Sequence, residues 1–277
     1  MRSAADWVPG GAWLAPGYAE WAPPAPLRGM VACFWASVVP DTISPQAAAH
    51  DGLVLPDGCS DLIWQQGAGA FVAGPDTGPF HFATPAGTVL VGVRFRPSAG
   101  GCALGMPLSE IRDMRAPLAE LLPAAARMLP ASLDPAIAAQ RARDIAGLLL
   151  SRAAPDSAVG RATALLRDPA ARVEQVADDV DLSMRQLRRR FHDAVGYGPK
   201  TLQRVLRFQR FVRALDACGG ACDLAASAAE AGYADQAHLT RECVALSGMT
   251  PAALAGIRGG SGVRGIGDHG GGDLAEA

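Results

Sequence analysis

Long apolar runs are missing from this sequence of 277 residues. A membrane-spanning helix needs about 20 consecutive apolar residues, and apolar stretches such as residues 118–133 are interrupted by Pro123 and Pro130. The N-terminus carries Asp6, Glu20 and several prolines where a signal peptide needs a continuous apolar core. We therefore expect a cytoplasmic protein with no membrane partner.

Patterns typical of metal sites and catalytic sites are also missing. None of the five histidines pairs with a cysteine or an acid at the spacing of zinc ligands. Ser60, beside Asp57 and Asp61, has no histidine near it in the sequence to act as a base. The six cysteines are scattered, which favours reduced thiols, and Cys218 with Cys222 leaves a redox pair as an alternative. We expect no catalytic residue, no metal and no cofactor.

Lysine is nearly absent, Lys200 being the only one, and the net charge of the whole chain is −2. Positive charge is nevertheless concentrated in residues 183–213, which hold nine basic side chains and one acid, a local net charge of +8. Charge gathered in this way on helices is typical of a polyanion-binding surface. The nine basic residues are Arg185, Arg188, Arg189, Arg190, Lys200, Arg204, Arg207, Arg210 and Arg213.

The first part of the chain, residues 1–107, is predicted to be a β-rich sensing domain. Its glycines, prolines and short β-branched or aromatic runs are typical of strands joined by turns. The Asp57-Gly58 turn signal lies between two apolar runs, residues 53–55 and 62–64, and predicts a hairpin there.

Residues 88–97 alternate as a strand does. Val89, Val91, Val93 and Phe95 share one face, which we assign to the core. Arg94 and Arg96 share the other face, where they form either a binding site for a carboxylate or phosphate ligand or a solvated, salt-bridged surface.

Helical periodicity begins at residue 108 and continues to residue 257. We divide this part into a helical connector at residues 108–156 and a helical domain at residues 157–257, followed by a glycine-rich tail at 258–277 that is predicted to be disordered. In the connector, an apolar stripe forms either a dimerisation surface or an intramolecular packing face; its residues are Ile137, Ile145, Leu148 and Leu149.

Two helix-turn-helix units are predicted in residues 157–257, joined by a long amphipathic helix at residues 201–215. In the first unit, Ser183 caps a helix whose outward face carries arginines and whose buried stripe is Leu187, Phe191 and Val195. In the second unit, Gly232 permits a sharp turn and Asp235 caps the next helix. The buried stripe of that helix is Leu239, Cys243 and Leu246.

These motifs resemble the AraC family of transcriptional regulators, on the evidence of LSMRQLRRRFHDAVGYGP at residues 182–199 and AGYADQAHLTRECVALSGMTP at residues 231–251. The first half of the chain is similar to an uncharacterised domain that precedes this module in some members. The resemblance implies that two recognition helices enter successive major-groove segments of promoter DNA. The residues implied to contact DNA are Arg185, Gln186, Arg188, Arg189, His192, Lys200, Arg204, Gln236, Ala237, His238 and Arg241.

The sequence thus predicts an α+β protein in which a β-rich domain, with a cupin-like fold as one form of it, precedes an all-α double helix-turn-helix domain. We expect a sequence-specific DNA-binding regulator that is modulated by its N-terminal domain and is not an enzyme. A small-molecule effector, RNA polymerase and a second copy of the chain are further candidate partners. The alternative is a small-molecule enzyme or an alkyl-accepting domain fused to the DNA-binding module, for which the lone thiols are Cys33, Cys59 and Cys102.

Overall fold

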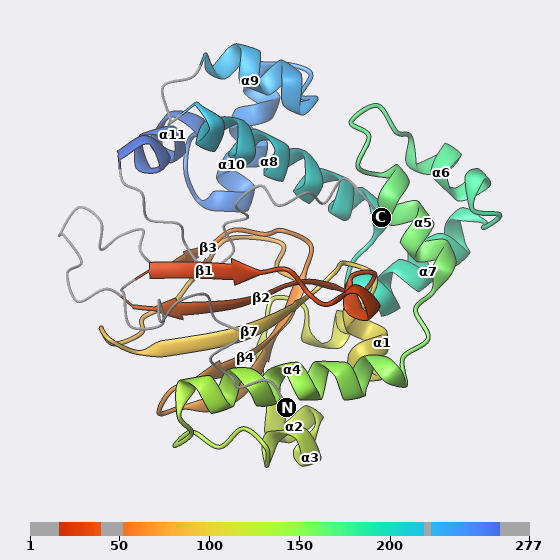
Figure 1. The fold of residues 1–277 in the computed structure, drawn as a ribbon. Helices are drawn as coiled ribbons and strands as arrows, with labels where there is room; N and C mark the ends of the chain where they lie inside the picture. The colour runs from red at the N-terminus through yellow and green to blue at the C-terminus, as the bar shows by residue number, and fades with distance from the viewer. Residues whose placement is uncertain (1–16, 40–51, 219–222, 261–277) are drawn as a thin grey trace.

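A computed structural model describes residues 17–39, 52–218 and 223–260 of the chain. In these ranges a strand-rich N-terminal half is followed by a helical C-terminal half (Figure 1). The α+β class predicted from the sequence is therefore confirmed. The last helix, α11 (Pro251–Gly260), extends into the predicted glycine-rich tail, and the rest of that tail lies outside the described residues. Within those ranges, no helix is long and apolar enough to cross a membrane.

The main sheet has six antiparallel strands, with β1 and β8 at its two edges. In spatial order the strands are β1 (Gly17–Trp21), β2 (Val31–Val38), β7 (Val89–Phe95), β4 (Ser60–Gln65), β5 (Gly69–Ala73) and β8 (Arg115–Pro117). A separate two-stranded ladder pairs β3 (Leu53–Val54) with β6 (Phe80–His81). The cupin-like form of this domain stays a prediction.

The hairpin predicted around Asp57 is wrong, because the strands on either side of it belong to different sheets. β3 pairs with β6, whereas β4 pairs with β5 and β7. The turn itself is present: Gly58 has a φ of +88°, and the amide of Cys59 donates to the carboxylate of Asp57 at 2.7 Å. A turn signal fixes a local change of chain direction, but it does not determine which strands then pair.

Strand alternation gives the main sheet two different faces. Val91, Val93 and Phe95 point into the larger core, as predicted, and α4 (Pro135–Ser151) covers this face. The opposite face carries Trp35 and Leu90, which belong to a smaller cluster. In Figure 1 the sheet lies between α4 below it and α8 (Pro199–Ala217) above it.

The predicted connector at residues 108–156 is partly built into the sheet domain. Residues 115–117 form strand β8, which pairs with β5, and Ile145 of α4 is buried against the sheet. Ile137 and Leu148 of the same predicted stripe each remain 48% exposed. The stripe is therefore divided between core packing and an outward face. Periodicity missed β8 because three residues are too few to show strand alternation.

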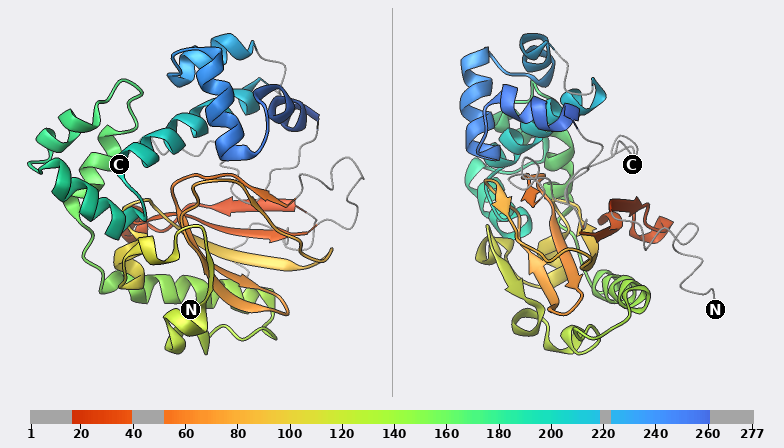
Figure 2. Two further views of the ribbon diagram at one scale, coloured as in Figure 1. Left: turned by 180° about the vertical axis from the view of Figure 1, so that it is seen from behind. Right: turned by 90° about the vertical axis from the view of Figure 1, so that its left-hand side faces the viewer.

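The helical half contains two helix pairs, and α8 lies between them. The first pair is α6 (Val173–Asp179) with α7 (Met184–Val195), and the second is α9 (Leu224–Ala231) with α10 (Gln236–Ser247). Helix α5 (Ser157–Leu165) precedes the first pair. Short helices interrupt the sheet domain: η3 (Ala25–Leu27) lies between β1 and β2, α1 (Gly100–Leu104) and η4 (Leu108–Ile111) lie between β7 and β8, and α2 (Leu118–Leu121) and α3 (Pro123–Ala126) lie between β8 and α4. Figure 2 shows α7 and α10 at opposite ends of α8 and on the same side of the molecule.

Candidate nucleic-acid interface and pocket

Helix α7 begins at a reciprocal cap between Ser183 and Gln186. The Ser183 hydroxyl accepts from the Gln186 amide at 3.3 Å, and Gln186 Oε1 accepts from the Ser183 amide at 2.9 Å. Two otherwise unpaired backbone donors at the start of the helix are satisfied in this way. On the inner face Leu187, Phe191 and Val195 are fully buried, as predicted. The helix is therefore fixed at its start and along one face.

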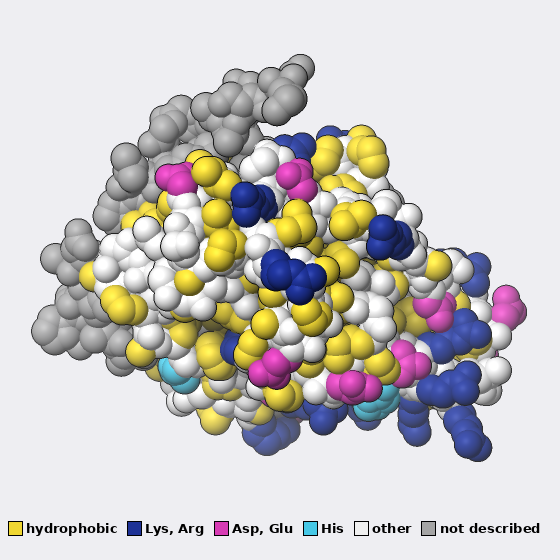
Figure 3. Space-filling view, turned by 90° about the horizontal axis from the view of Figure 1, so that it is seen from below, with side chains coloured by type: hydrophobic (Ala, Val, Ile, Leu, Met, Phe, Trp, Pro, Cys, Tyr) yellow, Lys and Arg dark blue, Asp and Glu magenta, His cyan; other side chains and the backbone are white. Residues whose placement is uncertain are grey.

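The outer face of α7 is basic and accessible. Arg185, Arg188, Arg189 and His192 are all exposed. In the described part of the chain, none of the three arginines takes part in an ion pair or a side-chain hydrogen bond. In Figure 3, Lys and Arg side chains gather along the lower edge, on the side of the molecule where α7 and α10 lie. A polyanion thus finds charge on α7 that the protein itself does not neutralise.

Other arginines of the basic segment serve the protein's own structure. Arg190 pairs with Asp156 at 3.1 Å, and Arg204 pairs with Glu242 at 2.8 Å. Arg210 donates to the carbonyl of Arg167 at 2.8 Å. The local charge of +8 is therefore not all directed at a partner. In particular, Arg204 of α8, predicted to contact DNA, forms an ion pair with Glu242 of α10.

Helix α10 presents a sparser surface. Gln236, Ala237 and Arg241 are exposed, whereas His238 is half-buried with its ring 5.2 Å from the Tyr233 ring. Asp235 caps this helix, as predicted, by accepting from the His238 amide at 2.6 Å. Lys200, at the start of α8, is exposed. Of the predicted contact residues on α10, Arg241 alone has a full positive charge directed outward.

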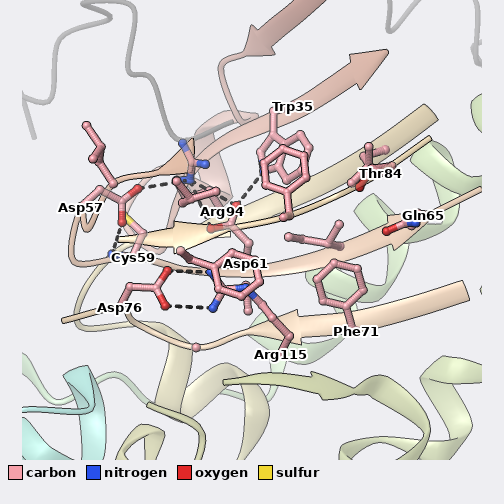
Figure 4. A pocket seen from close by; sticks show the side chains of 18 residues that line it. Trp35, Asp57, Cys59, Asp61, Gln65, Phe71, Asp76, Thr84, Arg94 and Arg115 are labelled. Carbon is pink, nitrogen blue, oxygen red and sulfur yellow. Dashed lines mark hydrogen bonds and ion pairs between the residues drawn. The ribbon is translucent and has the colours of Figure 1, made fainter. Parts of the chain in front are cut away.

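A pocket of about 620 Å³, including its open mouth, lies between the main sheet and the β3–β6 ladder. Its wall is mostly apolar and aromatic, with polar groups concentrated at one end. Figure 4 shows Asp57, Arg94, Asp61 and Asp76 at that end, whereas Gln65 and Thr84 lie at the other. The apolar side chains of the wall include Trp35, Ile63, Phe71, Phe80, Phe82 and Leu90.

Arg94 is the centre of the first buried ion network in the pocket. Its Nε lies 3.2 Å from one oxygen of Asp61 and 3.6 Å from one oxygen of Asp57, and its Nη1 lies 3.5 Å from Glu20. Asp61 also accepts from the indole nitrogen of Trp35 at 2.6 Å. Burial raises the pKa of Asp61, and the Arg94 charge opposes that rise. The guanidinium of Arg94 is thus already surrounded by carboxylates.

The second ion pair joins Arg115 of β8 to Asp76. Two nitrogens of the guanidinium donate to the two carboxylate oxygens at 2.9 and 2.7 Å. The same guanidinium stacks 3.7 Å from the centre of the Phe80 ring. This bidentate geometry fixes the orientation of both side chains.

Arg94 and Arg96 do not share a site, in contrast to their predicted placement on one strand face. Arg94 is 2% exposed and lines the pocket, whereas Arg96 lies beyond the end of β7, outside the pocket lining. Arg96 donates to the carbonyl of Arg28 at 2.8 Å. The i and i+2 positions share a face only while the strand continues, and β7 ends at Phe95.

Comparison with protein-family models places a domain of unknown function, DUF6597, at residues 19–117 and a helix-turn-helix domain of the AraC type at residues 176–256. The chain therefore carries the DNA-binding domain of an AraC-type transcription regulator. No curated protein and no solved structure matches it. The first match runs from within β1 to the end of β8, and the second runs from within α6 into α11. This AraC-type regulator therefore binds double-stranded DNA, and the uncharacterised N-terminal domain expected from the resemblance is confirmed.

Sequence reasoning missed most of the pocket of this AraC-type regulator. Asp61 directly precedes the apolar run Leu62, Ile63 and Trp64 of β4, and a charged residue there is a signal for a buried ion pair. Gln186 follows Ser183 by three positions, which is the spacing of a capping box. Arg115 gave no comparable signal, because its strand was not predicted.

The cysteines divide into two states. Cys33, Cys59, Cys102 and Cys243 are free thiols. Cys218 is disulfide-bonded, so the expectation of reduced thiols is wrong at this position; Cys222 lies outside the described residues. Within the ranges described, no group of three or more His, Cys, Asp and Glu side chains is arranged to hold a metal ion.

Proposed function

We propose that this regulator reads specific promoter DNA with two recognition helices, α7 and α10, and that the N-terminal domain modulates the reading. The proposal that α7 reads DNA rests on the contrast between the buried face and the exposed basic face of this helix. Phe191 and its neighbours are buried completely, while Arg185, Arg188 and Arg189 stand exposed with no acid paired to them in the described chain. A helix held this way presents its arginines to the major groove without reorganising.

The two helices have unequal roles in this proposal. Arginine recognises guanine through two hydrogen bonds in the major groove, and α7 offers three exposed arginines against Arg241 alone on α10. Gln236, near the start of α10, adds an amide that recognises adenine. We therefore assign most of the affinity to α7. Lys200 contacts the phosphate backbone and contributes sequence-independent affinity.

Helix α8 supports both readers by setting the distance between them. It packs against both helix pairs. Leu202 belongs to the same hydrophobic cluster as Phe191 of α7, and Phe208 belongs to the same cluster as Leu239 of α10. The Arg204–Glu242 ion pair ties it directly to α10. A displacement of α8 relative to the sheet domain would therefore change the placement of both recognition helices.

The N-terminal domain reaches α8 through residues 53–59, which we name the bridging segment. Leu55 packs in the same cluster as Phe208, and the carbonyl of Pro56 accepts from Gln209 at 2.7 Å. A Cβ at Gly58 would lie 3.0 Å from Leu202. Leu55, Asp57 and Cys59 also line the pocket. One short segment therefore touches both the pocket and the helix that spaces the readers.

Selection of bound sequences from random duplexes tests the reading proposal, followed by mobility shifts on the selected site. We expect a double-stranded site whose affinity falls steeply with salt, because basic side chains displace counterions from DNA. Substituting Arg188 and Arg189 together by alanine abolishes selection, whereas the same substitution of Arg152, exposed at the end of α4, leaves it intact. Affinity that does not depend on salt would contradict the proposal.

No catalytic step is part of the proposal, and the thiol chemistry does not favour the enzyme or alkyl-acceptor alternative. A nucleophilic cysteine needs a lowered pKa. Burial instead raises the pKa of Cys33, Cys59 and Cys102.

Association with a second copy of the chain is also part of the proposal, with Ile137 and Leu148 as the exposed apolar contacts. Substituting both residues by serine and measuring the oligomeric state tests it.

A further inference from the structure

The pocket of the N-terminal domain has the composition of a small-molecule site. Ligand pockets commonly combine an apolar lining with a few placed polar groups. This pocket has such a lining. Its polar groups are charged and gathered at one end, so they indicate the chemical class of the ligand.

Among the described residues, carboxylates predominate at this end of the pocket. The described lining contains three carboxylates, those of Asp57, Asp61 and Asp76, and two guanidinium groups. A fourth carboxylate, that of Glu20, lies 3.5 Å from Arg94 although it does not line the pocket. Acids therefore outnumber bases around the same small volume.

An anionic ligand fits this end poorly. It would have to displace Asp61 from Arg94, or break the bidentate pair between Asp76 and Arg115. It would also enter beside carboxylates that repel it. Breaking a buried ion pair leaves an uncompensated charge, which is strongly unfavourable. A positively charged group, by contrast, is attracted by the same carboxylates and breaks neither ion pair.

The rings of the wall favour the same charge. The indole of Trp35 lies over the sheet at Gly92, where a Cβ would approach the ring to 2.2 Å. Phe71 and Phe82 line the pocket with it. The faces of aromatic rings attract organic cations, most strongly where water is excluded. Rings and carboxylates together are the chemistry that recognises an ammonium group on an apolar body.

We propose that this pocket binds a small organic cation, with its ammonium group near Asp57 and Asp61 and its apolar body against Trp35 and Phe71. The proposal rests on the proposed function, in which the N-terminal domain modulates DNA reading, and it names the class of effector. The occupant contacts the bridging segment directly, because Leu55, Asp57 and Cys59 form one wall of the pocket.

Three probes of one shape test the charge class: 4-phenylbutylamine, 4-phenylbutanol and 4-phenylbutanoate, which are cationic, neutral and anionic. Binding to the full chain is followed by tryptophan fluorescence, since Trp35 lines the pocket, and by the shift in thermal unfolding. We expect the amine to bind roughly tenfold more tightly than the alcohol, and the carboxylate most weakly. Equal affinities, tightest binding of the carboxylate, or no binding of any probe would each overturn the proposal.

Two variants locate the binding. Asp57→Asn removes one negative charge and keeps the oxygen that accepts from the Cys59 amide, so the amine should lose its advantage over the alcohol while the alcohol binds as before. Thr84→Trp places a large side chain at the end of the pocket away from the acids, so binding of all three probes should be lost. Amine binding that both variants retain would show a site elsewhere and overturn the assignment.

The same preparations separate this proposal from the proposed function. Mobility shifts on the selected DNA site are run with and without the amine. If the probes fail to bind while the protein reads DNA, the cation pocket is wrong and the two-helix reading stands. If the amine binds by the pocket criteria and DNA affinity does not change, the pocket stands and its modulatory role is wrong.

Discussion

The side-chain amide of Gln209, in the middle of α8, donates a hydrogen bond of 2.7 Å to the backbone carbonyl of Pro56, in the bridging segment beside the pocket. Gln209 is 7% exposed, so water does not compete for this bond. The bond joins α8, which lies between the two proposed recognition helices, to the wall of the pocket. It is a direct polar connection between the segments to which we assign sensing and DNA reading.

We predict that Gln209→Ala uncouples these functions. Loss of the donor leaves the Pro56 carbonyl buried and unpaired, at a cost of about 1–3 kcal/mol in the free energy of unfolding. Affinity for 4-phenylbutylamine should persist, whereas its effect on DNA affinity should shrink. Gln203→Ala is the matched control, because Gln203 is a buried glutamine of the same helix that donates to Ala171 within the helical half. Equal responses in the two variants would contradict the prediction.

Arg189→Ala should weaken binding to the selected DNA site by about 1–3 kcal/mol and relax the base preference at one position. The reason is the loss of a bidentate contact to guanine. Lys200→Ala should instead weaken all sequences alike and reduce the dependence of affinity on salt. Mobility shifts on single-base variants of the site distinguish the two outcomes. A uniform loss for Arg189→Ala would assign that residue to the phosphate backbone.

Gln186 has a structural role that competes with its predicted contact to DNA. Ser183→Ala and Gln186→Ala each break the reciprocal cap of α7, and each should lower the free energy of unfolding by about 0.5–2 kcal/mol. Thermal unfolding measures that loss. If Gln186 acts through the cap alone, both variants should keep the same base preference as the wild type. A changed preference in the Gln186 variant alone would show that this side chain also reads a base.

Gly92→Ala should destabilise the sheet domain and disturb the pocket. A Cβ at this position would lie 2.2 Å from the Trp35 ring, and the indole would have to leave its place beside Asp61. Overpacking of this kind costs about 1–3 kcal/mol. Gly147→Ala in α4 is the control, because a Cβ there meets nothing within 4 Å and alanine favours the helix. Thermal unfolding should move in opposite directions for the two variants.

Binding of the amine probe should depend on pH. Burial raises the pKa of Asp61 and of Asp76 above the ordinary value. As the pH falls through these raised values, the carboxylates take up protons and the pocket loses negative charge, so affinity for 4-phenylbutylamine should fall. Affinity for 4-phenylbutanol should stay constant. Fluorescence titrations between about pH 7 and about pH 4 check this; parallel curves for the two probes would contradict it.

The sequence by itself determined the local structure of the helical half. Four-residue spacing of Leu187, Phe191 and Val195 fixes the buried face of α7, because a helix returns to the same side after about 3.6 residues. Ser183 and Asp235 fix where two helices begin, since each cap uses only neighbours in the chain. The family motifs lie in this half for the same reason: their geometry is local.

Only the tertiary structure decided the pocket and the use of each arginine. Asp61, Asp76 and Arg115 come from separate strands and loops, and sheet pairing brings them together; no local pattern encodes which strands become neighbours. The same holds for Arg94 and Arg96, which strand spacing placed together and the end of β7 separated. Arg189 and Arg190 are adjacent in sequence, yet Asp156 pairs with Arg190, whereas Arg189 has no ion pair in the described part of the chain. The sequence gives the number of charged side chains, whereas only the fold determines which of them form ion pairs within the protein.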